Sequence, residues 1–204
     1  MHATEHATKH TTNMNAQAQA VLDFWFGGAM PRKEWFQKSV AFDQEIAQRF
    51  GAQIEQALEG GLHAWDAEGP QGTLARILVL DQFCRNVYRE TPLSFAGDHQ
   101  ALQAAQDLID AGEDQTLTPF QRAFVYVVLE HAEDLAIQQQ AVALFTRLAE
   151  EQPGDQGIAS MLDYAKRHRD VIQRFGRFPH RNVILQRAST AAEQEFLKQP
   201  GSKF

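Results

Sequence analysis

The sequence contains a single cysteine, Cys84, and no long hydrophobic run. One cysteine cannot form an internal disulfide, and such sparse use of cysteine is typical of proteins in a reducing cytoplasm. No window approaches the roughly 18 consecutive apolar residues that a membrane-spanning helix needs. The hydrophobic stretch of a secretory signal peptide is also missing. These absences predict a cytoplasmic protein that does not insert into a membrane.

Basic residues are in the minority. The chain has 19 Lys and Arg against 26 Asp and Glu, which gives a formal net charge of −7 and an isoelectric point near 5.6. Nucleic-acid-binding surfaces carry an excess of positive charge, so nucleic acid is excluded as the main partner. The 204 residues, of which 44% are hydrophobic, suffice for one domain with a sizeable core.

Common catalytic and cofactor-binding motifs are absent. The sequence has no phosphate-binding P-loop, no G-x-G-x-x-G after a strand and no G-x-S-x-G nucleophile elbow, so no cofactor is expected. The predicted helices contain no Glu-x-x-His pair of the kind that builds a di-iron site, so no metal is expected. Arg85 would lower the pKa of an exposed Cys84 thiol, but a lone cysteine on an apolar helix is more often buried and inert.

The first fourteen residues are rich in Thr and His and nearly free of apolar side chains. His2, His6 and His10 recur every four residues and can chelate a metal if the segment is helical. A disordered tail is the favoured interpretation of residues 1–14, because nothing apolar holds the segment to a core. Residues 15–204 are predicted to form a single all-helical domain.

Capped amphipathic patterns, each ended by glycine or proline, follow one another along residues 15–204. They predict an all-α fold of about eight helices joined by short loops, arranged as stacked antiparallel hairpins. The predicted helices run from the cap Asn15 to Phe26, from the cap Ser39 to Leu58, over 73–88, from the cap Asp98 to Gly112, from Thr118-Pro119 past Val128, over 135–149, over 155–175, and from the Thr190/Glu193 capping box to about Lys198.

Two features of the sequence bear on this prediction. The 34-residue tetratricopeptide repeat has no clear match in the sequence, so any stacking of that kind must be degenerate. The segment 124–129, Phe-Val-Tyr-Val-Val-Leu, has the composition of a strand. Its cap signal at Thr118-Pro119 and its length favour a buried helix.

Three predicted helices carry an ionisable residue where the apolar stripe calls for a hydrophobic one. These residues are Asp81, His131 and His168. Arg85 lies four residues after Asp81, a favourable spacing for an ion pair within a helix. Burial of an unpartnered polar group costs on the order of several kcal/mol, so each of the three needs a partner. We therefore predict that these helices converge on one pocket.

A basic turn follows the seventh predicted helix. Its sequence over 174–182 is Arg-Phe-Gly-Arg-Phe-Pro-His-Arg-Asn. The glycine and the proline end the helix and fix the path of the turn. Several guanidinium groups in one turn need negative partners. Glu133 and Asp134, next to His131, are candidates to orient an imidazole or to pair with these arginines.

Together these features predict a pocket with arginines at its mouth, suited to the carboxylate or phosphate of an anionic small molecule or to an acidic peptide. The candidate ligand-binding residues are Asp81, Arg85, His131, His168, Arg174, Arg177, His180 and Arg181. Binding is the favoured interpretation.

Two alternatives stay open. In a small enzyme, for example a hydrolase, His131 or His180 would act as general base or acid, and Arg177 and Arg85 would stabilise developing negative charge. In a purely structural domain, the same polar residues would only hold the helices in register.

Several segments carry a family resemblance. They are Val-Leu-Asp-Phe-Trp-Phe (21–26), Trp-Phe (35–36), Leu-Asp-Gln-Phe-Cys-Arg-Asn-Val-Tyr-Arg (80–89), His-Ala-Glu-Asp-Leu (131–135) and the basic turn. In these motifs the chain resembles the bacterial family called domain of unknown function 924, whose members resemble tetratricopeptide-like helical folds. The likeness spans about residues 21–197. It implies an all-helical fold and supplies no reaction. Cys84 stands where that family usually has proline, which implies that the thiol is not a required nucleophile.

Overall fold

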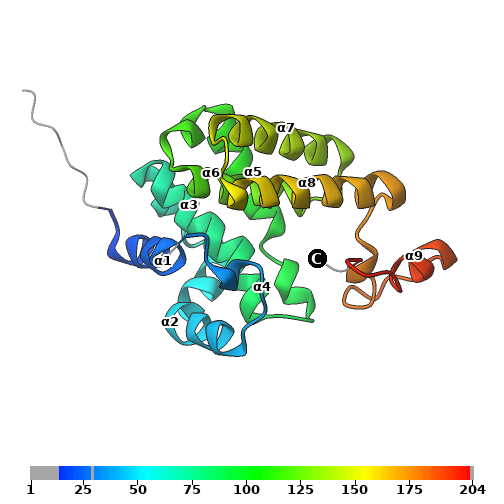
Figure 1. Cartoon of the computed structure of the whole chain (residues 1–204). Coiled ribbons are helices and arrows are strands. Elements are labelled where there is room, and N and C mark those ends of the chain that lie inside the picture. The colour runs from blue at the N-terminus through cyan, green and yellow to red at the C-terminus, as the bar shows by residue number, and fades with distance from the viewer. Residues whose placement is uncertain (1–13, 29, 203–204) are drawn as a thin grey trace, which may run out of the picture.

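The computed structural model describes residues 14–28 and 30–202, and these residues contain helices and loops but no β-strand (Figure 1). The all-α prediction is confirmed. The predicted tail, apart from Met14, lies outside the described residues, as do His2, His6 and His10. The α-helices are α1 (Ala16–Phe26), α2 (Val40–Leu58), α3 (Pro70–Leu78), α4 (Cys84–Val87), α5 (Asp98–Asp110), α6 (Pro119–Glu130), α7 (Leu135–Glu151), α8 (Gln156–Phe175) and α9 (Ala191–Phe196).

Side-chain caps determine where most of these helices begin. The Asn15 side chain accepts a hydrogen bond from the backbone N–H of Gln17, and the Ser39 hydroxyl accepts one from Phe42. Capping boxes open α6, at Thr118, and α9, at Thr190. Such caps satisfy backbone N–H groups that have no partner inside the helix, so these helix starts could be predicted from the sequence.

The third predicted helix differs from expectation. It begins at Pro70 rather than Thr73, and a π-helical turn, η3 (Val79–Phe83), separates α3 from the short α4. A π turn inserts an extra residue into the helix and is frequent at functional sites. The prediction of Asp98 as a cap was also wrong, because Gly97 occupies the cap position and Asp98 is the first helical residue of α5.

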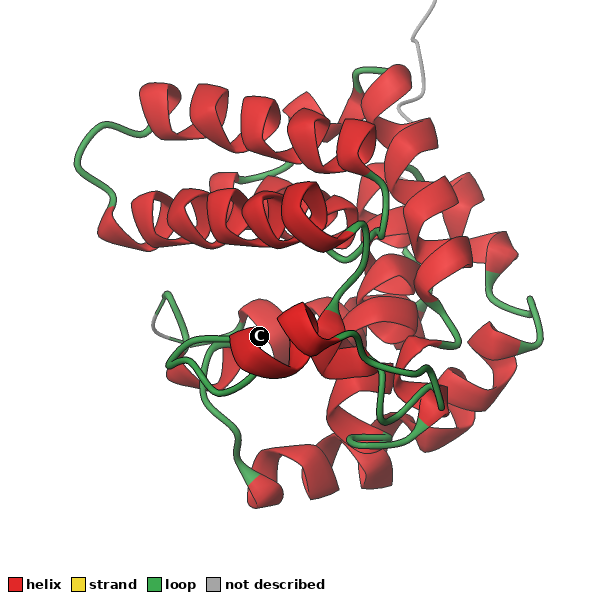
Figure 2. Ribbon diagram, turned by 90° about the vertical axis from the view of Figure 1, so that its right-hand side faces the viewer, coloured by secondary structure: helices red, strands yellow, loops and turns green. Residues whose placement is uncertain are grey.

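The core forms where α3 packs against α1, α5 and α6, while α7 packs against both α6 and α8. Figures 1 and 2 both show α7 and α8 lying side by side. Trp25, Phe83 and Tyr126 are fully buried in this core. The segment 124–129 is part of α6, as the cap signal predicted, and its strand-like composition reflects the burial of every residue in it except the half-buried Val127.

The C-terminal segment after α8 has a small apolar cluster of its own. Gly176 ends α8 in the left-handed conformation, as its place in the basic turn predicted. Val171, Ile172 and Phe178 form this second cluster, against which Phe175 and Phe196 pack. Polar contacts therefore contribute much of the attachment of residues 176–202 to the rest of the molecule.

No helix in the ranges 14–28 and 30–202 is both long enough and apolar enough to cross a membrane.

The close approach of α5 to the π turn gives a first prediction. A Cβ atom on Gly97 would overlap the backbone carbonyl of Leu80 in η3. We expect Gly97→Ala to lower the free energy of unfolding by about 1–3 kcal/mol, because backbone on both sides must move. Urea denaturation followed by circular dichroism measures this change.

The control is Gly51→Ala in the middle of α2, where an added Cβ meets nothing within 4 Å. This variant should gain about 0.5–1 kcal/mol, because alanine loses less conformational entropy in a helix. Equal effects at the two positions would contradict the importance of the contact between Gly97 and Leu80.

Candidate functional site

Asp81 lies in the π turn η3 and is almost completely buried. Its Oδ1 atom lies 2.8 Å from Nη1 of Arg85 and 2.7 Å from Nδ1 of His131 at the end of α6. Its Oδ2 atom accepts a hydrogen bond from the Gln82 side chain. Burial alone would raise the pKa of Asp81, but Arg85 and His131 hold it well below its ordinary value. The carboxylate is therefore charged at neutral pH.

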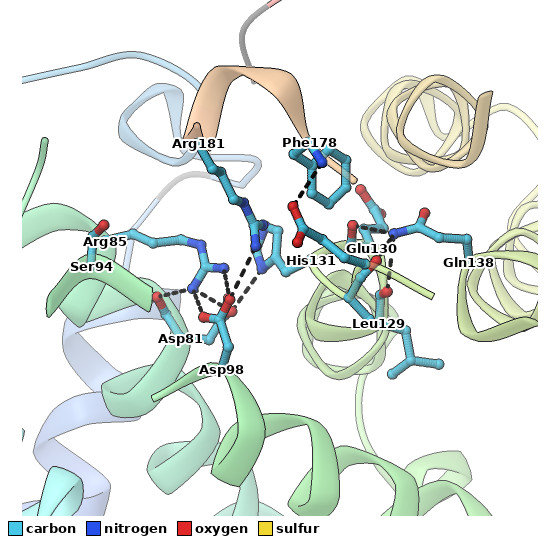
Figure 3. A network of polar contacts seen from close by, with 12 residues as sticks. Asp81, Arg85, Ser94, Asp98, Leu129, Glu130, His131, Gln138, Phe178 and Arg181 are labelled. Carbon is cyan, nitrogen blue, oxygen red and sulfur yellow. Dashed lines mark hydrogen bonds and ion pairs between the residues drawn. The ribbon is translucent and has the colours of Figure 1, made fainter. Parts of the chain in front are cut away.

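Arg85 joins Asp81 to α5. Its Nη1 and Nη2 atoms donate to the two carboxylate oxygens of Asp98, at 2.7 and 3.0 Å. The same Nη1 atom is the one that contacts Asp81, so a single nitrogen lies between two carboxylates (Figure 3). Such bidentate, charge-assisted contacts are strong and directional.

Arg181 approaches Asp98 from the C-terminal segment, in the 3-10 turn η6 (Pro179–Arg181) (Figure 3). Its guanidinium lies 4.7 Å from the ring centre of Phe95 and 4.5 Å from that of Phe178. It contacts Asp98 only through Nη1, at 3.4 Å, and its buried Nε has no hydrogen-bond partner among the described residues. Burial and the neighbouring Arg85 lower the pKa of Arg181 to about 10.

His131 has a defined tautomer. Because the charged Asp81 carboxylate can only accept, Nδ1 of His131 must carry the proton, and Nε2 of the neutral ring must be an acceptor. Burial and Arg85 lower the pKa of His131, although Asp81 opposes them. The ring is therefore neutral at physiological pH, and 15% of its side chain is exposed.

His168 and Glu130 form the inner wall of the site. Nδ1 of His168 donates to the Tyr164 carbonyl at 2.8 Å and lies 3.3 Å from Oε2 of Glu130. Burial and the nearby His131 lower the pKa of His168 to about 3. Burial, with Asp81 adding to it, raises the pKa of Glu130 well above its usual range. His168 is therefore neutral at pH 7, so its contact with Glu130 is not an ion pair.

His180 belongs to the same neighbourhood. Its ring centre lies 5.7 Å from that of Phe178, which in turn lies 5.6 Å from the ring of His168. Burial and Arg181 lower the pKa of His180 to about 4. We refer below to the polar cluster, which consists of Asp81, Arg85, Asp98, Glu130, His131, His168, His180 and Arg181.

Arg174 and Arg177 lie outside the polar cluster. Arg174 is exposed and stacks on the rings of Phe175 and Phe196. Arg177 forms a bidentate ion pair with Glu193, at 2.7 and 2.9 Å, and so ties the basic turn to α9. The sequence pattern could not separate them from Arg181, because neighbours in a turn point in different directions.

The expected roles of Glu133 and Asp134 were wrong. Glu133 accepts two hydrogen bonds from Arg187, at 2.6 and 2.9 Å, and one from the backbone N–H of Phe178. The Asp134 side chain caps α7 instead. Arg187 follows the basic turn and was not recognised from the sequence as a partner.

Cys84 is buried, and burial together with Asp81 raises the pKa of its thiol to about 12. The prediction that this cysteine is buried is confirmed, and a thiol of that pKa is a poor nucleophile at neutral pH.

Two open hollows of the described surface, of about 290 and 480 Å³, lie near the end of α1. Their walls include Arg32 and Gly27, and no residue of the polar cluster lines them. Within residues 14–28 and 30–202, no group of three or more His, Cys, Asp or Glu side chains is placed to hold a metal ion.

Comparison with known proteins identifies a family. A family model described as a bacterial protein of unknown function, DUF924, matches residues 21–201. The solved structure of ATU0120, a protein of unknown function from Agrobacterium tumefaciens, is 39% identical in sequence. It superimposes with a TM-score of 0.79 over 91% of this chain and 99% of that one. No curated protein matches the chain.

The raised pKa of Glu130 predicts a pH-dependent effect of Glu130→Gln. Because the folded-state pKa of Glu130 lies above its unfolded value of 4.5, its contribution to stability is complete below pH 4.5. That contribution is lost progressively as the pH rises from 4.5 to the folded-state pKa. The amide cannot ionise, so the variant should become more stable relative to wild type over this range, by up to about 1.4 kcal/mol for each pH unit between 4.5 and the folded-state pKa, and the difference should stay constant above it.

Thermal unfolding between pH 5 and pH 9 measures the difference. Glu195→Gln, at a side chain that is 69% exposed, is the control for the change from Glu to Gln itself. A difference between Glu130→Gln and wild type that does not change with pH would show that the Glu130 carboxylate is charged in the folded protein.

Proposed function

The chain belongs to the DUF924 family of bacterial proteins, and since membership supplies a fold without a reaction, we propose a function from the polar cluster alone. We propose that the protein binds a small anionic molecule in the cytoplasm, and that Arg181 contacts the carboxylate or phosphate group of that molecule. The candidate site comprises Arg181 with His131, His168 and His180, oriented by Asp81 and Arg85. Arg174 and Arg177, which the sequence predicted as site residues, are left out because they lie outside the polar cluster.

Incomplete neutralisation of Arg181 is the observation that carries this proposal. Arg85 engages both Asp81 and Asp98 at 2.8 Å or less. Arg181 shares one oxygen of Asp98 with Arg85, at 3.4 Å, although its own side chain is only 8% exposed. Buried guanidinium groups normally have most of their N–H donors satisfied. An oxyanion beside Nε would supply the missing acceptor in bidentate geometry.

The other arginines favour a small molecule over an acidic peptide. A peptide with several carboxylates needs a row of accessible cations on the surface. The carboxylates of Glu193 and Glu133 already occupy Arg177 and Arg187 through paired hydrogen bonds. Among the buried arginines of the described residues, Arg181 is the least neutralised, so a compact anion fits the charge distribution better.

Replacement of Arg181 by an uncharged residue tests the proposal. Thermal unfolding of the wild-type chain would be followed with inorganic phosphate, citrate, succinate and lactate as probes. A ligand present at ten times its dissociation constant should stabilise the fold by about 1.4 kcal/mol, which raises Tm by about 3–6 °C. Arg181→Gln should abolish the shift, because it removes the buried, incompletely paired guanidinium that is proposed to contact the anion.

Arg174→Gln is the matched control. It removes the same charge from the neighbouring surface, where Arg174 only stacks on aromatic rings, and it should keep the full shift. Equal shifts for the two variants, or no shift in wild type with any of the probes, would leave the polar cluster with a structural role.

The Asp81–His131 pair favours a second candidate function, that of an enzyme. A buried carboxylate on Nδ1 leaves Nε2 ready to accept a proton, which is the arrangement of a histidine general base. The pKa of His131, lowered by burial and Arg85, keeps the base unprotonated at neutral pH. Arg181 would then stabilise negative charge on a substrate that carries an ester or phosphoester.

Hydrolysis of p-nitrophenyl acetate and p-nitrophenyl phosphate tests this second function. If His131 is the base, His131→Gln should reduce kcat by about 100-fold or more. His63→Gln, at an exposed histidine of η2 (His63–Glu68), should have no effect. Wild-type rates no higher than those of His131→Gln on both esters would contradict it.

A further inference from the structure

Like Nε of Arg181, Nε2 of His131 is a nitrogen of the candidate site without a hydrogen-bond partner among the described residues. Nδ1 donates to Asp81 at 2.7 Å, and no described residue makes a hydrogen bond with Nε2. The ring makes an edge contact with His168, with the ring centres 6.2 Å apart. Since the neutral ring already has its proton on Nδ1, Nε2 can only accept. A partner at this atom must therefore bring an N–H or O–H donor.

His131 and Arg181 lie on either side of the same small group of charges. Nη1 of Arg85 is 2.8 Å from Oδ1 of Asp81 and 2.7 Å from Oδ1 of Asp98. His131 contacts the first carboxylate and Arg181 the second, so each lies one carboxylate away from that nitrogen (Figure 3). Arg181 and His131 thus belong to one continuous series of contacts, which is the reason to consider a single compact ligand for both.

Arg181 and His131 require opposite hydrogen-bonding groups on a ligand. The unpartnered Nε of Arg181 requires an acceptor, and an anionic oxygen is the strongest one. Nε2 of His131 requires a donor. An acceptor placed against Nε2 would leave two lone pairs facing each other, which weakens binding.

We propose that the site selects an oxyanion that carries its own hydroxyl donor, as a hydrogen phosphate group or a 2-hydroxycarboxylate does. This inference rests on the proposed anion binding at Arg181 and adds the chemical class of the ligand. The ionised oxygens contact Arg181, and the hydroxyl donates to Nε2 of His131. An anion of equal charge and size without a hydroxyl satisfies Arg181 alone.

Two matched pairs of anions test this selection by isothermal titration calorimetry on the wild-type chain at pH 8, where His131 is neutral. Phosphate at this pH is a dianion with one O–H, and sulfate is a dianion of the same shape with none. Lactate carries a 2-hydroxyl group, and pyruvate carries a 2-oxo group at the same position. The hydroxyl-bearing member should bind about tenfold more tightly in at least one pair, because it alone satisfies Nε2.

The pair that shows the preference identifies the source of the oxyanion. Tighter binding of phosphate than of sulfate indicates a phosphorylated ligand. Tighter binding of lactate than of pyruvate indicates a hydroxy acid. Equal binding within both pairs, or tighter binding of sulfate or pyruvate, would overturn the selection and leave anion binding at Arg181 standing. Failure of all four anions to bind would overturn the proposed function itself.

Variants assign the preference to His131. His131→Gln should reduce it to about threefold or less, because an amide can turn either its donor or its acceptor toward the ligand. His63→Gln removes an imidazole that is 62% exposed and should keep the full preference. If a folded His131→Gln variant still preferred the hydroxyl-bearing anion, another group would be the one that binds the hydroxyl.

Discussion

One guanidinium nitrogen, Nη1 of Arg85, is the point on which the interior of this molecule depends. It lies within hydrogen-bond distance of carboxylates from the π turn and from α5. Through Asp81 it orients His131 at the end of α6, and through Asp98 it reaches Arg181 of the C-terminal segment. Removal of either carboxylate would leave buried charge poorly compensated, which is costly in a low-dielectric interior. Four parts of the chain thus share one electrostatic arrangement.

The remaining ionisable groups fall into two kinds. Some form complete ion pairs, as Arg177 does with Glu193 and Arg187 does with Glu133. These ion pairs hold the C-terminal segment in place. Others are kept neutral by burial, as His168 is. Arg181 belongs to neither kind, since it is buried, charged and incompletely paired. That exception is the basis on which we propose a binding site.

The sequence predicted part of the site. Asp81, His131 and His168 interrupt apolar stripes, and because buried polar groups need partners, their meeting could be foreseen. Asp98 could not, because an aspartate at the start of a helix usually interacts with the helix end. Glu130 also gave no signal, since adjacent residues on a helix point in different directions and only its burial beside Asp81 raises its pKa. Which arginine of the basic turn faces inward depends on the path of the turn.

Local interactions explain what the sequence alone determined: an all-helical chain with capped starts, glycine ends and a family signature. Caps, helical periodicity and turn residues act over a few positions, so they can be read directly. Only the tertiary structure decided the π turn, the sharing of Arg85 between two carboxylates and the incomplete pairing of Arg181. These features depend on distances between segments far apart along the chain, such as Arg181 and Asp98, and on burial that shifts proton affinities.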